Sequence, residues 1–262
     1  MKAEDYLRGR HAIVTGGGRG IGAAIAHELA ARGADLSLLG RDMDRLHETA
    51  EVIRNRYDSK VETHQVDVTS LTSVQNAFAE AVKPLGRVYV LVNNAGQAQA
   101  SAFPDMKPEL WKRMIDANLT SVFYCTQQVL PSMAKAGEGR IVNIASVAGL
   151  KGGKKISAYS AAKHGVIGLT RSLALEYAKS GVTINAVCPG YTESEMFDRA
   201  VAELVKSVGK SADEARAMLA RPNPQARIVK ADEVADAVAW LCSPGASAIT
   251  GQAIAVAGGE VM

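Results

Sequence analysis

A serine, a tyrosine and a lysine are the residues whose types and spacing could perform acid–base chemistry. Tyr159 and Lys163 are four positions apart, so they are neighbours if they share one helix face. A tyrosine hydroxyl has a pKa of about 10, and a neighbouring ammonium lowers that pKa towards neutrality. Ser146 could hydrogen-bond the substrate oxygen with which Tyr159 exchanges a proton. Alternatively, Tyr159 and Lys163 form only a surface pair, and Ser146 caps a strand.

The surrounding segments would bring these side chains to one edge of a sheet. The apolar run from Ile141 to Ala145 predicts a buried strand that ends at Ser146. After a loop of glycine and lysine, Ser157 could cap a helix that carries the tyrosine and the lysine. Open α/β sheets bind ligands at the carboxyl ends of their strands, so Ser146 is predicted to lie at a ligand site.

A second motif lies near the N-terminus. His11 to Thr15 reads as a short strand, and it is followed by Gly16, Gly20 and Gly22 and then by a helical pattern. Glycines between a strand and a helix let the backbone approach a pyrophosphate, whose charge suits the helix N-terminus. The spacing predicts a nucleotide site, although the glycines could serve only as turn residues.

Further motifs follow in order, namely Asn93-Asn-Ala-Gly96, Asn118 and Pro189-Gly190. Together with the glycine loop, Ser146 and the Tyr-x-x-x-Lys pair, they resemble the compact, single-domain short-chain dehydrogenase/reductases, and are similar to the 3-oxoacyl-thioester reductases. The resemblance implies one α/β domain over residues 1–262, with a Rossmann-type doubly wound parallel sheet of about seven strands. It also implies hydride transfer between NAD(P)(H) and a ketone or secondary alcohol.

The resemblance gives roles to individual residues. Tyr159 is the acid/base, Lys163 lowers its pKa and holds the ribose, and Ser146 orients the carbonyl. Asn118 bends the helical stretch from Pro108 to Lys135 and supports a proton relay. The implied cofactor contacts are Gly16, Gly18, Arg19, Gly20, Ile21, Gly22, Arg41, Asp67, Val68, Asn94, Ala95, Gly96, Tyr159, Lys163, Pro189, Gly190, Thr192 and Ser194. No metal site is predicted.

The residues after the second predicted strand bear on the choice of cofactor. The position that is acidic in NAD enzymes of the family aligns with Gly40, and Arg41 follows it. An arginine there can pair with a 2′-phosphate, and Arg19 adds a second cation, so NADP(H) is favoured. NAD(H) is possible because Asp42 could reach a ribose, and both arginines could simply be surface charges.

Two assignments stay open in the sequence. Asp67 could contact the adenine, or it could cap a helix from about Ser70 to Lys83. After Pro189-Gly190 the chain departs from the family pattern, so either Thr192 or Ser194 could contact the cofactor.

The substrate is less certain than the reaction. The polar stretch at about 194–225 is where the family builds a substrate lid. Lys151, Lys154 and Lys155 could attract the phosphates of a coenzyme A or acyl-carrier thioester, or serve only as solubilising charges. We therefore expect a 3-oxoacyl-thioester reductase. The alternatives are an NAD-dependent dehydrogenase of an alicyclic, aryl or polyol alcohol, and an NADP-sensing binding protein without catalysis.

Composition fits an ordinary globular protein. The chain has 262 residues, 47% hydrophobic and 22% charged, and a net charge of +3 that is too small to indicate a nucleic-acid partner. Three widely spaced cysteines suggest reduced thiols in the cytoplasm, and no apolar run predicts a membrane span. The family resemblance implies a homotetramer.

Overall fold

The computed structural model describes residues 5–262. Within them, seven strands form one parallel sheet in the order β3-β2-β1-β4-β5-β6-β7. Their bounds are β1 (His11–Thr15), β2 (Asp35–Gly40), β3 (Val61–Gln65), β4 (Val88–Asn93), β5 (Gly139–Ile144), β6 (Val182–Pro189) and β7 (Ala253–Val256). The predicted Rossmann-type sheet is therefore confirmed. The strand order reverses between β1 and β4, and such a switch point opens a crevice for ligands at the carboxyl edge.

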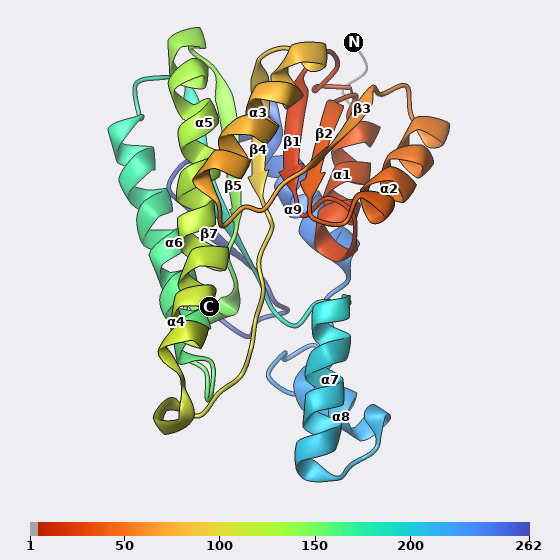
Figure 1. The fold of residues 1–262 in the computed structure, drawn as a ribbon, viewed down its shortest axis with the longest axis vertical. Coiled ribbons are helices and arrows are strands. Elements are labelled where there is room, and N and C mark those ends of the chain that lie inside the picture. Colours follow the sequence, from red (N-terminus) through yellow and green to blue (C-terminus); the bar gives the residue numbers. More distant parts are fainter. Residues whose placement is uncertain (1–4) are drawn as a thin grey trace.

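Helices cover both faces of this sheet (Figure 1). One face carries α1 (Gly20–Ala31), α2 (Met43–Arg56) and α9 (Ala231–Cys242). The other carries α3 (Leu71–Leu85), α5 (Ser121–Ala136) and α6 (Ser157–Glu176). Strands buried on both faces need continuous apolar runs, and the two such runs noted in the sequence, His11–Thr15 and Ile141–Ala145, correspond to β1 and β5.

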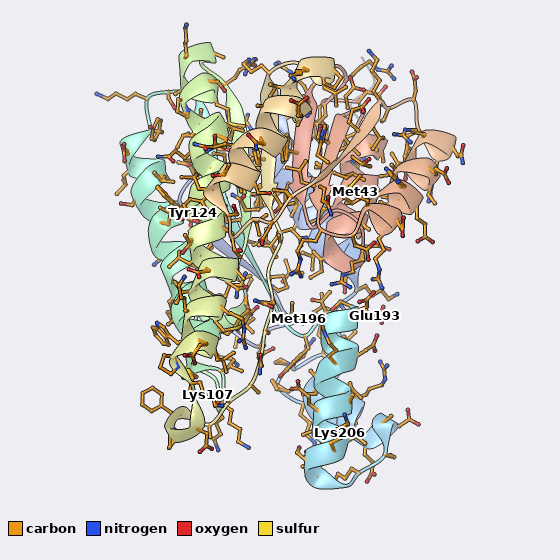
Figure 2. All side chains as sticks on the ribbon, viewed as in Figure 1. Met43, Lys107, Tyr124, Glu193, Met196 and Lys206 are labelled. Atoms are coloured by element: carbon orange, nitrogen blue, oxygen red, sulfur yellow. The ribbon has the colours of Figure 1, made fainter. Side chains whose placement is uncertain are left out.

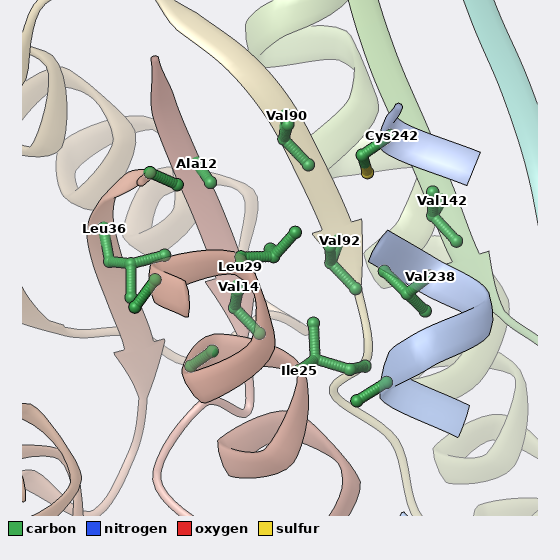
Figure 3. Close-up of a cluster of buried hydrophobic side chains, with 14 of the residues drawn as sticks. Ala12, Val14, Ile25, Leu29, Leu36, Val90, Val92, Val142, Val238 and Cys242 are labelled. Carbon is green, nitrogen blue, oxygen red and sulfur yellow. The ribbon is translucent and has the colours of Figure 1, made fainter. Parts of the chain in front are cut away.

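The largest core cluster fixes the helix that follows the glycine loop. Figure 3 shows Ile25 and Leu29 of α1 facing Val14 of β1 and Val92 of β4, with Val238 of α9 beside them. All of these side chains are fully buried. This packing holds the N-terminus of α1 at the carboxyl edge of the sheet, next to the glycine loop.

The helical stretch from Pro108 to Lys135 is interrupted at the asparagine singled out above. It divides into α4 (Pro108–Ile115), a π-helical turn (Asp116–Thr120) and α5. Asn118 lies within the turn, and its side-chain amide donates a hydrogen bond of 2.9 Å to the Met114 carbonyl. Such bonds compete with the regular helical ladder, and a π-turn in a long helix is common at functional sites.

Helices α7 (Glu195–Val208) and α8 (Ala212–Ala220) extend beyond the carboxyl edge of the sheet (Figure 1). They bury a small apolar cluster of their own, which includes Phe197, Val201 and Ala215. Figure 2 shows Glu193 and Met196 at the end of α7 nearest the sheet and Lys206 towards its far end. Short 3-10 turns occupy Phe103–Asp105, Val147–Gly149 and Pro244–Ala246. Over residues 5–262, no helix is long and apolar enough to cross a membrane.

Candidate active site

Ser146 stands directly after β5, at the carboxyl edge of the sheet. Its hydroxyl oxygen accepts a hydrogen bond of 3.1 Å from the Ala148 backbone N–H and so caps the short turn that follows. Ser146 is therefore a cap, but of the turn after the strand and not of the strand itself. A serine hydroxyl that accepts one bond keeps its own hydrogen free to donate, so capping also orients the group towards a ligand.

Tyr159 lies in the first turn of α6, next to Ser146. Burial raises the pKa of its hydroxyl to about 12, while a hydrogen bond with the Ser146 hydroxyl acts in the opposite direction. The tyrosine is consequently protonated at neutral pH and can act as a proton donor.

Lys163 lies one turn further along α6 and is only 4% exposed. Its Nζ donates a hydrogen bond of 2.7 Å to the Ile144 carbonyl and lies 5.7 Å from the centre of the Tyr159 ring. Burial lowers the pKa of Lys163 to about 8. Because the lysine is buried, the alternative of a solvated surface pair is wrong. The sequence predicted that Lys163 lowers the pKa of Tyr159. In this structure Lys163 is not among the groups that shift that pKa.

Asn118 is fully buried and reaches the same place from the π-helical turn. Its amide donates to the Gln97 carbonyl at 2.8 Å, and its oxygen accepts from the Gln97 backbone N–H at 3.1 Å. A Cβ on Gly96 would lie 2.7 Å from this oxygen and 3.8 Å from the Lys163 Nζ. The backbone of Gly96 thus lies between the Asn118 oxygen and the Lys163 Nζ.

The glycine loop follows β1 and leads into α1. Gly16 and Gly20 have positive φ of +68° and +51°, which disfavour other residue types. A Cβ on Gly22 would lie 2.1 Å from the Gly16 carbonyl oxygen, so only glycine fits there. Arg19, the N-cap residue of α1, makes no side-chain capping bond, so the first N–H groups of the helix are left to a ligand.

The segment after β4 is tied to this loop. The Thr15 hydroxyl accepts hydrogen bonds from the backbone N–H groups of Asn94 (3.0 Å) and Ala95 (3.1 Å). The Asn94 amide donates to the carbonyls of Thr15 (3.0 Å) and Gly16 (3.3 Å). Asn94, Ala95 and Gly96 therefore line the passage from the glycine loop to Lys163, while Ile21 packs partly into the core below.

Charged residues gather where β2 ends. A Cβ on Gly18 would lie 3.1 Å from the Arg45 backbone, so the loop packs on the first turn of α2. Asp42 caps α2 through the Arg45 N–H at 3.3 Å and pairs with the Arg45 guanidinium at 3.2 Å. Arg19 and Arg45 both pair with Glu195 of α7. Arg45 and Glu195 were not predicted as site residues, because they are 150 positions apart and no sequence motif links them.

Asp67 and Val68 follow β3 along the same edge. The Asp67 carboxylate accepts from the Thr69 N–H at 2.9 Å and its hydroxyl at 2.7 Å, and these bonds lower its pKa. The cap of α3 is Ser70 instead, so the capping alternative for Asp67 is wrong. Arg41 is close enough for its charge to act on Asp67, while Val68 packs against the second core cluster.

The segment after β6 places the two candidate hydroxyls differently. Thr192 is 5% exposed, and its hydroxyl donates to the Gly190 carbonyl at 3.1 Å. Ser194 caps α7, and its Cβ would lie 3.4 Å from a Cβ on Gly20. Ser194 therefore faces the glycine loop, whereas Thr192 is turned inwards. Pro189 ends β6, next to Gly190.

The C-terminal tail contacts the loop between Ser146 and Tyr159. Glu260, whose side chain is 7% exposed, pairs with Lys151 at 3.1 Å and would lie 3.1 Å from a Cβ on Gly190. Lys151 is thus engaged within the protein, whereas Lys154 and Lys155 are exposed. A Cβ on Gly258 would lie 2.0 Å from the Asn223 oxygen, so the tail also packs on the segment after α8.

Comparisons with known proteins agree with this geometry. The family model described as short chain dehydrogenase matches residues 10–204. A Streptomyces violaceoruber protein named for a ketoacyl reductase of granaticin polyketide synthase is 41% identical over 95% of this chain and 92% of its own. The 3-oxoacyl-acyl-carrier-protein reductase FabG of Escherichia coli (strain K12) is 38% identical over 98% of this chain and 99% of its own. The crystal structure of an actinorhodin polyketide ketoreductase variant with NADPH has a TM-score of 0.92 and 39% identity, covering 96% of this chain and 97% of that one.

Proposed function

The chain belongs to the short-chain dehydrogenase family, and we propose that it is an NADP(H)-dependent reductase of 3-oxoacyl thioesters. The convergence of Ser146, Tyr159 and buried Lys163 beside the glycine loop carries this proposal. The relatives named as ketoacyl reductases support the substrate class.

The residues present fit a nicotinamide dinucleotide. The glycine loop forms a cradle that a Cβ on Gly22 would fill, and it leaves N–H groups at the start of α1 for a pyrophosphate. Ser194 lies against Gly20 of this loop, where its hydroxyl would have to give up its 3.0 Å bond to the Thr192 carbonyl to reach the pyrophosphate, and Asn94, Ala95 and Gly96 would hold the nicotinamide half. When bound, the cofactor supplies the hydride to the carbonyl carbon of the substrate.

The protein's own residues handle the proton. Ser146 donates its hydroxyl hydrogen to the carbonyl oxygen and so orients the ketone. Tyr159 then gives its hydroxyl proton to the same oxygen, which completes the alcohol. Lys163, whose Nζ donates to the Ile144 carbonyl, would hold the ribose of the cofactor beside Tyr159. Asn118, across Gly96 from Lys163, supports the return of a proton from solvent.

Three positive charges support NADP(H) over NAD(H). Arg19 and Arg45 lie beside the glycine loop, and Arg41 follows β2. Asp42, the carboxylate that could have favoured NAD(H), is occupied as the cap of α2 and the partner of Arg45. Guanidinium groups pair well with a 2′-phosphate.

The proposal of a thioester substrate depends on the positive charges in the loop that precedes α6. Exposed Lys154 and Lys155 precede α6, and α7 with α8 would form the substrate lid at about 194–225. Replacing Lys154 and Lys155 with Gln should raise the KM for acetoacetyl-coenzyme A by about three- to tenfold at low salt, because the thioester carries phosphates. The control is Lys179→Gln, an exposed charge beyond the C-terminal end of α6.

An equal rise in KM for a small uncharged ketone would contradict the electrostatic role of this loop. Activity confined to uncharged ketones or to NADH would indicate an alcohol dehydrogenase instead.

We also infer a homotetramer and a cytoplasmic location. Phe123 on α5 and Leu175 on α6 are 47% and 81% exposed in the single chain, which suits association through these helices. The cysteines Cys125, Cys188 and Cys242 are free and buried, as suits a reducing compartment. Light scattering coupled to size exclusion gives the mass that tests the assembly.

The catalytic assignment is tested by Tyr159→Phe, which removes one hydroxyl and keeps the ring. Turnover of acetoacetyl-coenzyme A with NADPH should fall at least about a thousandfold, while NADPH affinity measured by fluorescence should change little. Turnover within about tenfold of the unmodified protein would refute the role of Tyr159. Loss of NADPH binding together with turnover would show damage to the fold instead.

A further inference from the structure

Glu195, the first residue of α7, joins two arginines beside the glycine loop. One carboxylate oxygen accepts a hydrogen bond from Arg19 of the loop, and the other accepts one from Arg45 of α2. These arginines are 176 and 150 positions away in the sequence. A residue of α7 therefore ties that helix to the place where β1 and β2 end.

The same arginines lie where the proposed cofactor would need cations. The glycine loop packs on the first turn of α2, since a Cβ on Gly18 would lie 3.1 Å from the Arg45 backbone. A dinucleotide whose pyrophosphate follows this loop places its adenosine ribose near the end of the second strand. A 2′-phosphate on that ribose needs guanidinium partners, and a carboxylate that already holds two of them opposes it.

We propose that Glu195 is a specificity-determining residue that competes with the 2′-phosphate of the cofactor for Arg19 and Arg45. The inference rests on the proposed function, because only NADP(H) carries this phosphate. On NADP(H) binding, the two guanidinium groups exchange the carboxylate for phosphate oxygens, and α7 loses its tie to the glycine loop. NAD(H) has a hydroxyl at this position and leaves the tie in place.

The electrostatics agree with such an exchange. The hydrogen bond from Arg45 lowers the pKa of Glu195, and the charges of Arg19, Arg45 and Arg199 act in the same direction, so the group is a carboxylate at neutral pH. The paired side chains are 39% to 45% exposed. Exposed pairs are weak, so a phosphate dianion can replace the carboxylate.

The test uses two ligands that lack the nicotinamide. 2′,5′-ADP carries the 2′-phosphate and 5′-AMP does not, and calorimetry gives the Kd of each. The test variant is Glu195→Gln. The matched control is Glu193→Gln, which removes the same charge two residues earlier, where the side chain is exposed and the backbone N–H donates to the Val229 carbonyl at 3.0 Å (Figure 2).

Glu195→Gln should bind 2′,5′-ADP about two- to tenfold more tightly than the unmodified protein, because Arg19 is freed, Arg45 keeps only Asp42 as a partner, and one repulsive charge is lost. Its affinity for 5′-AMP should be unchanged, and the control should match the unmodified protein with both ligands. The gain should shrink at high salt. In the unmodified protein, 2′,5′-ADP but not 5′-AMP should speed hydrogen exchange in the first turn of α7.

Two results would overturn the inference. Weaker or unchanged binding of 2′,5′-ADP by the variant at 195 would mean that its carboxylate does not compete, and would leave the proposed function intact. Unmodified protein that binds 2′,5′-ADP no more tightly than 5′-AMP would refute the NADP(H) site and the competition together.

Discussion

Lys163→Met should make the folded protein more stable at neutral pH while it abolishes turnover. The ammonium of Lys163 is buried, and burial lowers its pKa from the usual 10.5 to about 8. At 1.36 kcal/mol per pKa unit, this corresponds to about 3 kcal/mol of unfavourable free energy when the group is charged. Methionine has a similar unbranched shape and carries no charge.

The substitution also has a cost. The Nζ donates a hydrogen bond of 2.7 Å to the Ile144 carbonyl, and its loss should cost about 1 kcal/mol. The net gain for the Met variant should therefore be about 2 kcal/mol at pH 7. A catalytic group that destabilises the fold in which it works gives this kind of gain when it is removed.

The sign of the effect depends on pH. Below about pH 8 the lysine is charged in both the folded and the unfolded protein, so the full penalty applies. Between about 8 and 10.5 the folded protein loses the proton that the unfolded chain still holds, and the penalty disappears. Near pH 10.5 only the lost hydrogen bond remains, so the variant should be less stable by about 1 kcal/mol.

Urea unfolding at pH 7, 8.5 and 10 measures this difference, at one protein concentration for all samples. The control is Lys179→Met, which changes an exposed lysine and should show no such dependence. The argument from burial would be refuted if Lys163→Met were less stable than the unmodified protein at pH 7. It would also be refuted if its gain in free energy of unfolding were the same at pH 7 and pH 10.

Three further outcomes are expected. Gly22→Ala places a Cβ 2.1 Å from the Gly16 carbonyl and should weaken NADPH binding at least about tenfold, whereas Gly168→Ala, with nothing within 4 Å, should bind normally; fluorescence titration compares them. Ser194→Ala removes the cap of α7 and should lower stability by about 1 kcal/mol and raise the KM for NADPH, as urea unfolding and kinetics would measure. The kcat/KM for ketone reduction should fall about tenfold per pH unit above about pH 8, where Lys163 loses its charge; a flat profile to pH 10 would exclude that dependence.

The strands and the glycine loop could be predicted because their causes are local. A strand buried on both faces needs an apolar run, and the cradle needs glycines at positions 16, 20 and 22. The strand that ends before Ser146 follows from the same reasoning; the helix that carries Tyr159 is present, but its N-cap is Ile156 and the predicted capping by Ser157 is wrong. The strands predicted at His11–Thr15 and Ile141–Ala145 begin and end within two residues of β1 and β5.

The contacts between distant charged side chains could not be predicted in this way. Glu260 meets Lys151 across 109 positions, and Glu195 meets Arg45 across 150. Many surface carboxylates and cations are equally suitable partners in sequence, and only the folded backbone selects among them. The π-helical turn was visible only as an asparagine in a poor position for a helix, since its cause is the bonds that Asn118 makes to Gln97 and Met114.

The first residues of α7 link the proposed cofactor site to the proposed substrate lid. Ser194 faces Gly20 of the glycine loop, and Glu195 pairs with Arg19 and Arg45, so adjacent positions contact the phosphate-binding side. The remainder of α7 packs on α8 through Phe197 and Val201, away from that side. We expect a change in the first-turn contacts of α7 to shift the rest of the proposed substrate lid, which α7 forms with α8. Substitutions that alter cofactor preference at Glu195 should therefore also change the KM for the thioester, even though Glu195 itself contacts no substrate.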